Sequence, residues 1–477
     1  MKTPIDAAAQ LAITTLTKQA PAASELAKLF KIAGFKLALV GGPVRDAILG
    51  RLGNDLDFTT DAHPKDSEKI LNKWADSVWD IGAAFGTVAG KKDEITVEIT
   101  TYRSESYDPT SRKPDIEFGK SIEADLARRD FTINAMALEL TTDEPTFIDL
   151  FNGVVDLQKK IIKTPGKPED SFSDDPLRMM RAARFMSQLN FEVDQTVLVA
   201  IKNMAARLEI ISSERIRDEF IKIMMSPSPR LGITLLVETG LADYFLPEVP
   251  KLKLEIDEHH HHKDVYEHSL TVLEQAIALE DRLAGPNLTL RLAALLHDIG
   301  KPKTKQLIAG GGVSFHHHEV VGARMCKERM KKLRFDNHII NDVSQLVFLH
   351  LRFHGYGSGE WSDSAVRRYV RDAGELLTHL HLLTRADCTT RNKTKAEGLA
   401  RTYDQLEERI QLLMQQEELN KIRPDLSGEQ IMEILGIKPS PTVGKAYDFL
   451  LELRLEHGPL GEEKAKQALL TWWKEQK

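Results

Sequence analysis

The chain reads LALVGGPVRD at residues 37–46 and DLDFTT at residues 55–60, and these two stretches decide the fold that we expect for its first part. The apolar run LALV ends at two glycines, as a buried strand does when it stops at a tight turn. The residues after Gly41 and Gly42 then predict a helix whose first N–H groups face phosphate, with Arg45 adding positive charge.

Asp55 and Asp57 stand two residues apart in the second stretch. Alternate side chains of a strand point to one face, so both carboxylates would lie together. Such a pair binds Mg²⁺, and two ions lower the pKa of an attacking hydroxyl and stabilise a departing pyrophosphate. Taken singly, the glycine pair is more typical of a strand-to-helix corner, and the acids of a solvated turn. Together, at this spacing, they indicate nucleotidyl transfer.

Composition limits the classes of protein to which the chain can belong. Of its 477 residues 42% are hydrophobic, which leaves room for three or more domains with real cores. The formal net charge of -7 argues against a protein that coats nucleic acid indiscriminately, although a local basic track is compatible with it. Only Cys326 and Cys388 occur, too few for a disulfide framework, which indicates a reducing compartment.

Neither a secretion signal nor a membrane span is indicated by the hydropathy pattern. The first residues lack the apolar core of a signal peptide, and no later run is long and apolar enough to cross a bilayer. We therefore expect a cytoplasmic protein without a membrane partner. The oligomeric state is not given by the sequence.

The pattern of apolar residues changes along the chain. Between about residues 35 and 150, β-rich runs at residues 37–40, 56–60, 85–89, 95–101 and 135–140 alternate with helical pieces, whereas apolar residues after Asp174 recur at helical spacing. We therefore expect an α+β protein: a small mixed α/β palm followed by largely all-α domains. The expected domains cover residues 1–150, 151–255, 256–395 and 396–477.

A second motif, RRDFTINA, occupies residues 128–135. Two guanidiniums beside an acid and an amide can grip a triphosphate and its ribose, although a surface cluster capped by Asn134 would have the same residues. Shortly before it, the strand-like run TVEIT carries one carboxylate, Glu98. Glu98 is either a third acid of the metal site or an exposed strand residue, and the sequence leaves both open.

The third motif, DDPLRMMRAARF at residues 174–185, predicts a helix opened by two acids and a proline. Asp175 and Arg178 are spaced to share one face of it. A carboxylate accepts from the exocyclic amine of a base and a guanidinium donates to a ring acceptor, so the pair can imitate a complementary base edge. Cytosine and adenine offer an amine beside an acceptor, whereas guanine and uracil do not in that arrangement. An ordinary salt-bridged amphipathic helix remains the alternative.

The three motifs, in this order, resemble those of the class II nucleotidyltransferases of the polymerase β superfamily, and in particular the CCA-adding tRNA nucleotidyltransferases. The family pattern Glu-Asp-x-x-Arg is changed only in its first acid, which is Asp174 here. The segment Ser213–Lys222 also matches a family segment, on a helix of the neck.

The resemblance implies template-independent addition of CCA to the tRNA 3′ end from CTP and ATP, with Mg²⁺ and release of pyrophosphate. It implies a head, a helical neck and body that bind RNA and nucleotide, and a helical tail. The catalytic and head metal residues would be Asp55, Asp57 and Glu98. The nucleotide site would consist of Gly41, Gly42, Arg45, Asp46, Arg129, Asp130, Asn134, Asp175, Arg178, Arg181 and Arg184.

The second half of the chain carries a different set of ligand residues. His268 begins one expected helix, His297 and Asp298 in LLHDIGK end another, and Asp387 lies on a third. Four nitrogen and oxygen ligands on three helices can converge on a divalent metal and leave positions open for water. The spacing resembles an HD-domain phosphohydrolase, which implies a second site for Mg²⁺, Mn²⁺, Ni²⁺ or Co²⁺. His318 and His350 are further candidate ligands.

Several questions stay open at the level of the sequence. Poly(A) synthesis, or addition of only CC or only A, uses the same three head motifs. An HD phosphohydrolase with a nucleotide-sensing head and a tRNA-binding scaffold are alternatives of other classes, although either would leave the acids and arginines of the head unexplained. The run His259–His262 is compatible with a solvated loop or a cap of the next helix.

Overall fold

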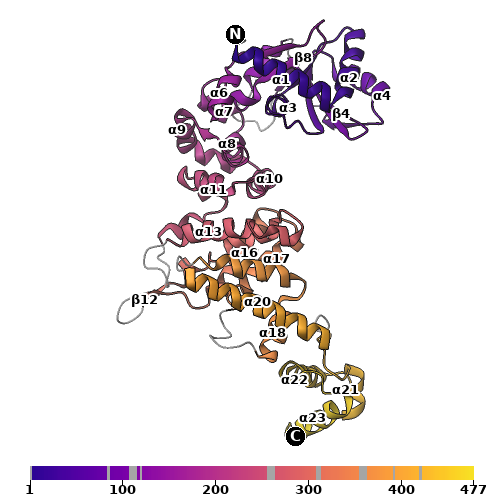
Figure 1. The fold of residues 1–477 in the computed structure, drawn as a ribbon, viewed down its shortest axis with the longest axis vertical. Helices are drawn as coiled ribbons and strands as arrows, with labels where there is room; N and C mark the ends of the chain where they lie inside the picture. The colour runs from indigo at the N-terminus through magenta and orange to yellow at the C-terminus, as the bar shows by residue number, and fades with distance from the viewer. Residues whose placement is uncertain are drawn as a thin grey trace. The chain divides into compact units, whose positions relative to one another are not determined.

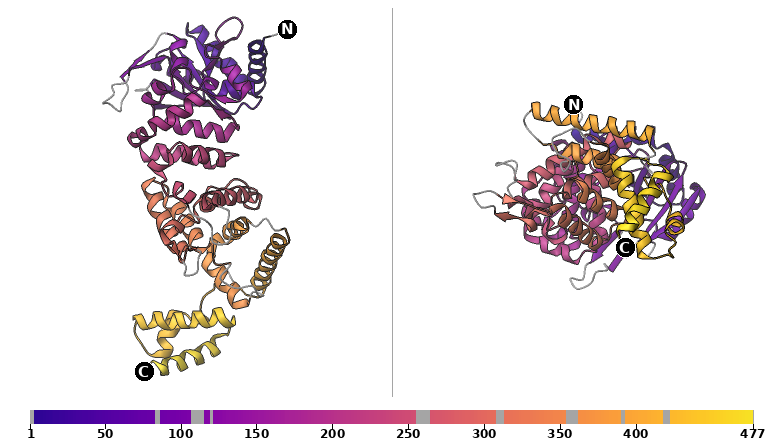
Figure 2. Two further views of the ribbon diagram at one scale, coloured as in Figure 1. Left: turned by 90° about the vertical axis from the view of Figure 1, so that its left-hand side faces the viewer. Right: turned by 90° about the horizontal axis from the view of Figure 1, so that it is seen from below.

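The computed structural model describes residues 3–82, 86–106, 115–118, 121–254, 264–307, 313–353, 362–389, 393–417 and 422–476. The chain divides into two compact units, residues 1–244 and 245–477, drawn in Figures 1 and 2. Among the described residues, a seven-stranded sheet lies in the first unit, and the second unit is helical apart from one short ribbon. The α+β class expected from the sequence is confirmed.

The sheet of the first unit has the strand order β3-β4-β5-β2-β1-β8-β9. Its strands are β1 Leu37–Val40, β2 Asp55–Thr60, β3 Ser77–Gly82, β4 Thr87–Lys92, β5 Ile95–Thr101, β8 Met136–Glu139 and β9 Thr146–Asp149. Neighbouring strands run antiparallel except β2 and β5, which run parallel. All four residues of β1 are buried, as their apolar run predicts.

Helices and a separate two-stranded ribbon flank this sheet (Figure 1). The helices are α1 Pro4–Gln19, α2 Pro21–Ile32, α3 Gly42–Ile48, α4 Pro64–Trp74, α5 Ile122–Ala127 and α6 Gly153–Lys159. The ribbon pairs β6 Arg103–Ser106 with β7 Asp115–Phe118. The helix α1 packs on α3 and α6, and α4 packs on β4.

Gly41 forms the turn between β1 and α3. Its φ of 75° lies in the left-handed region that favours glycine. A Cβ atom at this position would lie 2.7 Å from Nη1 of Arg129, so a side chain here would also displace that guanidinium. The turn therefore brings the backbone close to the second motif.

A helical neck completes the first unit. It contains α7 Pro168–Asp174, α8 Leu177–Leu189, α9 Gln195–Met204, α10 Ser213–Met224, α11 Pro229–Glu238 and α12 Ala242–Phe245, with the short ribbon β10 Ile161–Ile162 and β11 Glu192–Val193. The helix α8 packs on α10 and α11. The third motif begins at Asp174, the last residue of α7, and continues into α8.

The second unit is built from helices in two groups. The first group is α13 Val265–Ile277, α14 Leu288–Leu296, α15 Lys301–Thr304, α16 His318–Lys332, α17 Asn337–Leu349, α18 Asp363–Ala373, α19 Leu377–Asp387 and α20 Lys393–Gln416, with the ribbon β12 Gln306–Leu307 and β13 Val313–Ser314. The second group is α21 Gly428–Leu435, α22 Pro441–His457 and α23 Glu462–Glu475. The second group has its own small core, centred on Ile431, Leu450 and Leu469.

Two sequence expectations fall partly or wholly on residues outside the described ranges. These are the histidine run at 259–262 and the start of the strand expected from Phe85. Within the described residues, no helix has both the length and the hydropathy needed to cross a membrane.

Candidate active site and candidate metal centre

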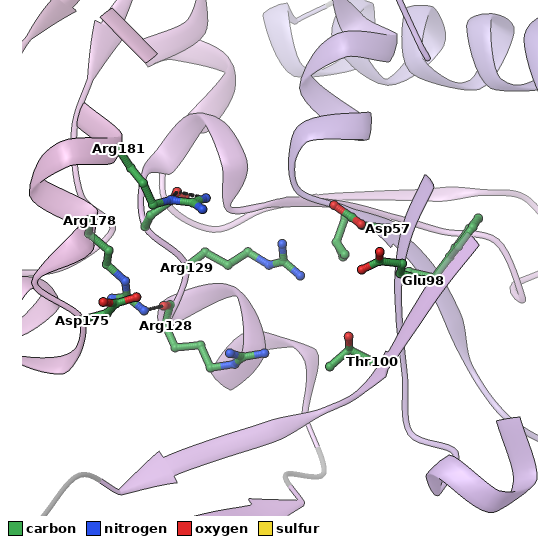
Figure 3. Close-up of a pocket in the computed structure, with 11 residues that line it drawn as sticks. Asp57, Glu98, Thr100, Arg128, Arg129, Asp175, Arg178 and Arg181 are labelled. Atoms are coloured by element: carbon green, nitrogen blue, oxygen red, sulfur yellow. Dashed lines mark hydrogen bonds and ion pairs between the residues drawn. The ribbon is translucent and has the colours of Figure 1, made fainter. Parts of the chain in front are cut away.

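A cavity of about 400 Å³ lies in the first unit between the sheet and the start of α8. Figure 3 shows carboxylates and Thr100 on one side, Arg128 and Arg129 in the middle, and the third motif on the other side. The lining residues are Val40, Asp57, Phe58, Glu98, Thr100, Arg128, Arg129, Asp130, Asp175, Arg178 and Arg181. All three motifs therefore contribute to one cavity.

The carboxylate side is formed by two neighbouring strands. Asp57 and Glu98 are Cα partners in the parallel pair β2 and β5, so their side chains leave the sheet on the same face. Loss of hydration raises the pKa of Asp57, and Asp55 adds to it. Loss of hydration also raises the pKa of Glu98, followed by repulsion from Asp57. Two carboxylates that lose hydration side by side, with a third acid on the strand of Asp57, form an environment that suits a divalent cation.

The two arginines of the second motif share one buried acid. Asp125 of α5 accepts hydrogen bonds from Arg128 Nη2 at 2.6 Å and from Arg129 Nη2 at 3.2 Å. Burial alone would raise the pKa of Asp125, but the two guanidiniums hold it below its ordinary value. Arg128 lines the cavity beside Arg129, although the sequence analysis counted only Arg129 as a site residue.

Asp130 connects the second and third motifs. Its Oδ2 accepts from Arg181 Nε at 2.7 Å, and its Oδ1 accepts from Asn134 Nδ2 at 3.0 Å. The Oδ1 of Asn134 accepts in turn from Arg45 Nη1 at 2.7 Å, and Arg45 also donates to Asp46. Arg45 and Asn134 are buried, and this chain of hydrogen bonds fixes α3 and α8 to the second motif.

The third motif differs from the expectation at one point. The expected helix, α8, starts at Leu177 directly after the two acids and Pro176, but Asp174 is the last residue of α7 and Asp175 lies before α8. Asp175 is extended, with φ -141° and ψ 101°, as a residue before proline prefers. The shared helix face therefore does not exist, yet Asp175 and Arg178 line the same cavity.

Other residues hold this pair in place. Asp175 accepts from the Leu177 amide at 3.1 Å and from Arg215 Nη2 of α10 at 2.8 Å. Arg178 donates to Ser171 Oγ at 2.9 Å and to the Arg128 carbonyl at 2.6 Å. The contact with Arg215 was not expected, because no local pattern relates residues so far apart.

Not every expected site residue reaches the cavity. Arg184 is buried and donates to Glu219 of α10 at 2.9 Å, and burial lowers its pKa to about 10. Among the described residues, it is absent from the cavity lining, as are Gly41, Gly42, Arg45, Asp46, Asp55 and Asn134. In this structure Arg184 connects α8 to α10.

The second unit contains a separate buried cluster. His268 of α13 and His297 after α14 place their Nε2 atoms 3.3 Å apart. Asp387, the last residue of α19, has its Oδ1 2.9 Å from His268 Nε2 and 3.5 Å from His297 Nε2. The Oδ2 of Asp298 is 3.2 Å from His297 Nε2 and 2.9 Å from Lys301 Nζ. The four expected ligands therefore converge from three helices.

Charge in this cluster is balanced within the protein. Burial raises the pKa of Asp298, but His297 and Lys301 hold it well below the ordinary value. Burial lowers the pKa of His297, but Asp298 and Asp387 outweigh it and raise the pKa to about 10. Two carboxylates that draw a proton onto a buried imidazole form the type of donor set that a divalent metal satisfies.

Comparison with protein families matches three parts of the chain. Residues 37–163 match the poly A polymerase head domain, residues 190–252 the probable RNA and SrmB-binding site of polymerase A, and residues 265–392 the HD domain. The A-adding tRNA nucleotidyltransferase of Deinococcus radiodurans is 32% identical over 446 residues, which cover 92% of this chain and 96% of that protein. The chain belongs to the tRNA nucleotidyltransferases.

Other relatives of this tRNA nucleotidyltransferase match over less of their length. The CCA-adding enzyme of Ligilactobacillus salivarius is 39% identical over 253 residues, 52% of this chain and 61% of that protein. The crystal structure of the Bacillus stearothermophilus CCA-adding enzyme in complex with CTP has a TM-score of 0.70 at 23% identity, and covers 100% of this chain and 99% of that one. The fold of the family is therefore present over the whole chain.

Proposed function

We propose that this tRNA nucleotidyltransferase adds C, C and A to the 3′ end of tRNA from CTP and ATP, without a nucleic-acid template. The observation that carries the proposal is that one cavity joins the carboxylates of β2 and β5 to the arginines of the second motif and to Asp175 and Arg178. A single nucleotide in this cavity would contact groups that suit metal binding, triphosphate binding and base reading.

Asp55, Asp57 and Glu98 would hold the Mg²⁺ ions of the head. The raised pKa values of Asp57 and Glu98 support this role, because a cation stabilises neighbouring carboxylates that have lost hydration. Bound Mg²⁺ would activate the tRNA 3′-hydroxyl and stabilise the pyrophosphate that leaves. Arg129 faces Asp57 and Glu98 across the cavity and would bind the triphosphate (Figure 3).

Asp175 and Arg178 would select the base. Both side chains reach the cavity, and their hydrogen-bond partners fix them before a nucleotide arrives. Preorganised polar groups discriminate strongly, since a base that fails to satisfy them leaves them unpaired. Solved structures of similar fold are described as complexes with CTP and with ATP, which is consistent with this choice.

Addition of A alone is a specific alternative, because one relative that aligns over nearly the whole chain is an A-adding enzyme. The test is to incubate the protein with tRNAs that end before CCA or after CC, with CTP and ATP separately and together, and to resolve products at single nucleotides. Growth by CCA supports the proposal. Growth only of the tRNA that ends in CC indicates an A-adding enzyme, and long A tails indicate poly(A) synthesis.

The cluster of His268, His297, Asp298 and Asp387 supports a second activity. We propose that it holds a divalent metal and hydrolyses a phosphoester by adding water across the phosphorus–oxygen bond. The mixed imidazole and carboxylate ligands suit Mn²⁺, Ni²⁺ or Co²⁺ as well as Mg²⁺. A screen of cyclic phosphates and phosphomonoesters with each of these four metals tests the activity, and turnover of none of them would contradict it.

A further inference from the structure

Phe185, the last residue of the third motif, is a buried aromatic residue to which the proposed chemistry gives no role. It is only 5% exposed. It lies on α8 four residues after Arg181, so the two side chains share one face of that helix. Phe131 of the second motif packs against it with nearly perpendicular rings, the centroids 5.7 Å apart. The Phe185 ring therefore lies where the second and third motifs meet.

Three guanidiniums surround this ring. The Cζ atoms of Arg184, Arg45 and Arg181 lie 4.5, 5.3 and 5.7 Å from its centroid. Arg45 belongs to α3 and follows the glycine turn of the first motif. A cation within about 6 Å of an aromatic centroid is attracted to the negative face of the ring. All three motifs therefore place a side chain against Phe185.

Three positive charges around one ring repel one another. Burial lowers the pKa of Arg184 to about 10, and the charges of Arg181 and Arg45 contribute to the fall. Each guanidinium has its own carboxylate partner, and these partners are Asp46 for Arg45, Asp130 for Arg181 and Glu219 for Arg184. The ring, in contrast, lies against all three guanidiniums, so its negative face offsets part of the repulsion between them.

Arg181 is the member of this group that lines the cavity. Its Nε lies 2.7 Å and its Nη2 2.5 Å from Oδ2 of Asp130. Among the residues that the structure describes, its Nη1 has no hydrogen-bond partner, and 34% of the side chain is exposed. Asp130 and the Phe185 ring therefore fix the guanidinium and leave one nitrogen for a phosphate oxygen.

We propose that Phe185 is a positioning residue for the incoming nucleotide: the face of its ring holds the Arg181 guanidinium at the cavity, where it binds the phosphates of CTP or ATP. The proposal rests on the proposed nucleotidyl transfer and adds to it a residue that touches no substrate. Leucine at this position would keep an apolar side chain but has no ring face, so packing and electrostatics can be separated here.

The test changes the electron density of the ring and leaves its shape almost unchanged. Phe185 in the full-length protein is replaced by phenylalanine that carries one, two or three ring fluorines, which weaken the negative face in steps. The dissociation constants of CTP and ATP are measured with Mg²⁺ and without tRNA. We expect both constants to rise at each step, by about three- to tenfold in total, the range of one partly buried cation–π contact.

Two comparisons assign the effect to Arg181. In a protein that carries Arg181→Met, the same fluorine series should change neither constant, because the cation that the ring holds is gone. Phe172 of α7 is the matched control, since it is fully buried and, within the described part of the chain, has no cation over its ring. Fluorination of Phe172 should leave both constants unchanged, whereas Phe185→Leu should weaken binding at least as much as the trifluorinated ring.

Constants that do not change across the Phe185 series, or a series with the same effect after Arg181→Met, would overturn the proposal. A melting temperature that falls in step with the affinity would indicate a packing effect and would overturn it as well. A graded loss of affinity at constant melting temperature supports the role of the ring even if the protein adds only A to tRNA. Failure of the wild-type protein to bind either nucleotide would contradict both this role and the proposed nucleotidyl transfer.

Discussion

Arg215 donates a hydrogen bond from Nη2 to Oδ2 of Asp175 across 2.8 Å, so a helix of the neck holds an acid of the proposed base-reading pair. The other oxygen of Asp175 accepts from the Leu177 amide. Both oxygens are therefore oriented, and base selection should depend on a residue that is absent from the cavity lining.

Arg215→Ala should reduce the preference for CTP and ATP over UTP and GTP. The pair is partly exposed, so we expect a loss of about two- to fivefold, the value of an ion pair of up to about 1 kcal/mol. The kcat/KM of each nucleotide is measured, and Arg215→Lys should restore part of the selectivity. Unchanged ratios with Arg215→Ala would show that Asp175 keeps its position without Arg215.

Asp57→Asn and Asp55→Asn should each abolish addition of both nucleotides, because C and A addition use one metal site. Loss of several kcal/mol of transition-state stabilisation corresponds to a fall on the order of a thousandfold in rate. Glu94→Gln is the control, an exposed acid in the turn between β4 and β5. Near-normal addition by either aspartate variant under Mg²⁺ would contradict the assignment.

Neutral substitutions of Asp175 and Arg178 should reduce the selectivity for cytosine and adenine. Asp175→Asn and Arg178→Gln should permit misincorporation of UTP or GTP, or lower addition, because the donor and acceptor pattern no longer matches cytosine and adenine. Products are sequenced after single-turnover addition. Wild-type selectivity together with the wild-type rate in both variants would refute the template role.

Changes in the HD domain should leave nucleotide addition intact. His297→Ala and Asp298→Ala remove proposed metal ligands from the second unit, whereas the head metal is held by carboxylates of the first unit. We expect normal CCA addition and loss of any metal-dependent phosphoester hydrolysis. If addition is lost at normal stability and tRNA affinity, the histidine cluster contributes to the transferase.

Asp125→Asn should destabilise the head by about 2 kcal/mol at neutral pH, because two guanidiniums lose their buried partner. The folded-state pKa of Asp125 lies below its unfolded value, so the stabilisation is present above about pH 4 and is lost as the pH falls through the folded pKa. Calorimetry of both proteins between pH 3 and 7 should therefore show a difference that shrinks in acid. Asp143→Asn, at a fully exposed site, is the control. A difference that stays constant down to pH 3 would contradict the charge argument.

Local patterns were sufficient for much of the fold and for most candidate residues. The apolar run before Gly41, the alternation around Asp55 and Asp57, and the helical spacing of the second half are each readable within a few residues. The outer strands β3 and β9 were missed, because the edges of a sheet are partly solvated and carry a weak apolar pattern. The helix face expected to be shared by Asp175 and Arg178 was wrong, because Asp175 is extended and lies before the first residue of α8.

The sequence by itself determined the motifs, their order and the chemistry of their side chains. Only the tertiary structure decided which of these side chains meet. Parallel pairing of β2 with β5 placed Glu98 beside Asp57, and packing of α8 on α10 placed Arg215 against Asp175. Such contacts depend on which elements pack together, since packing and hydrogen bonding between distant segments leave no periodic signal in either segment alone.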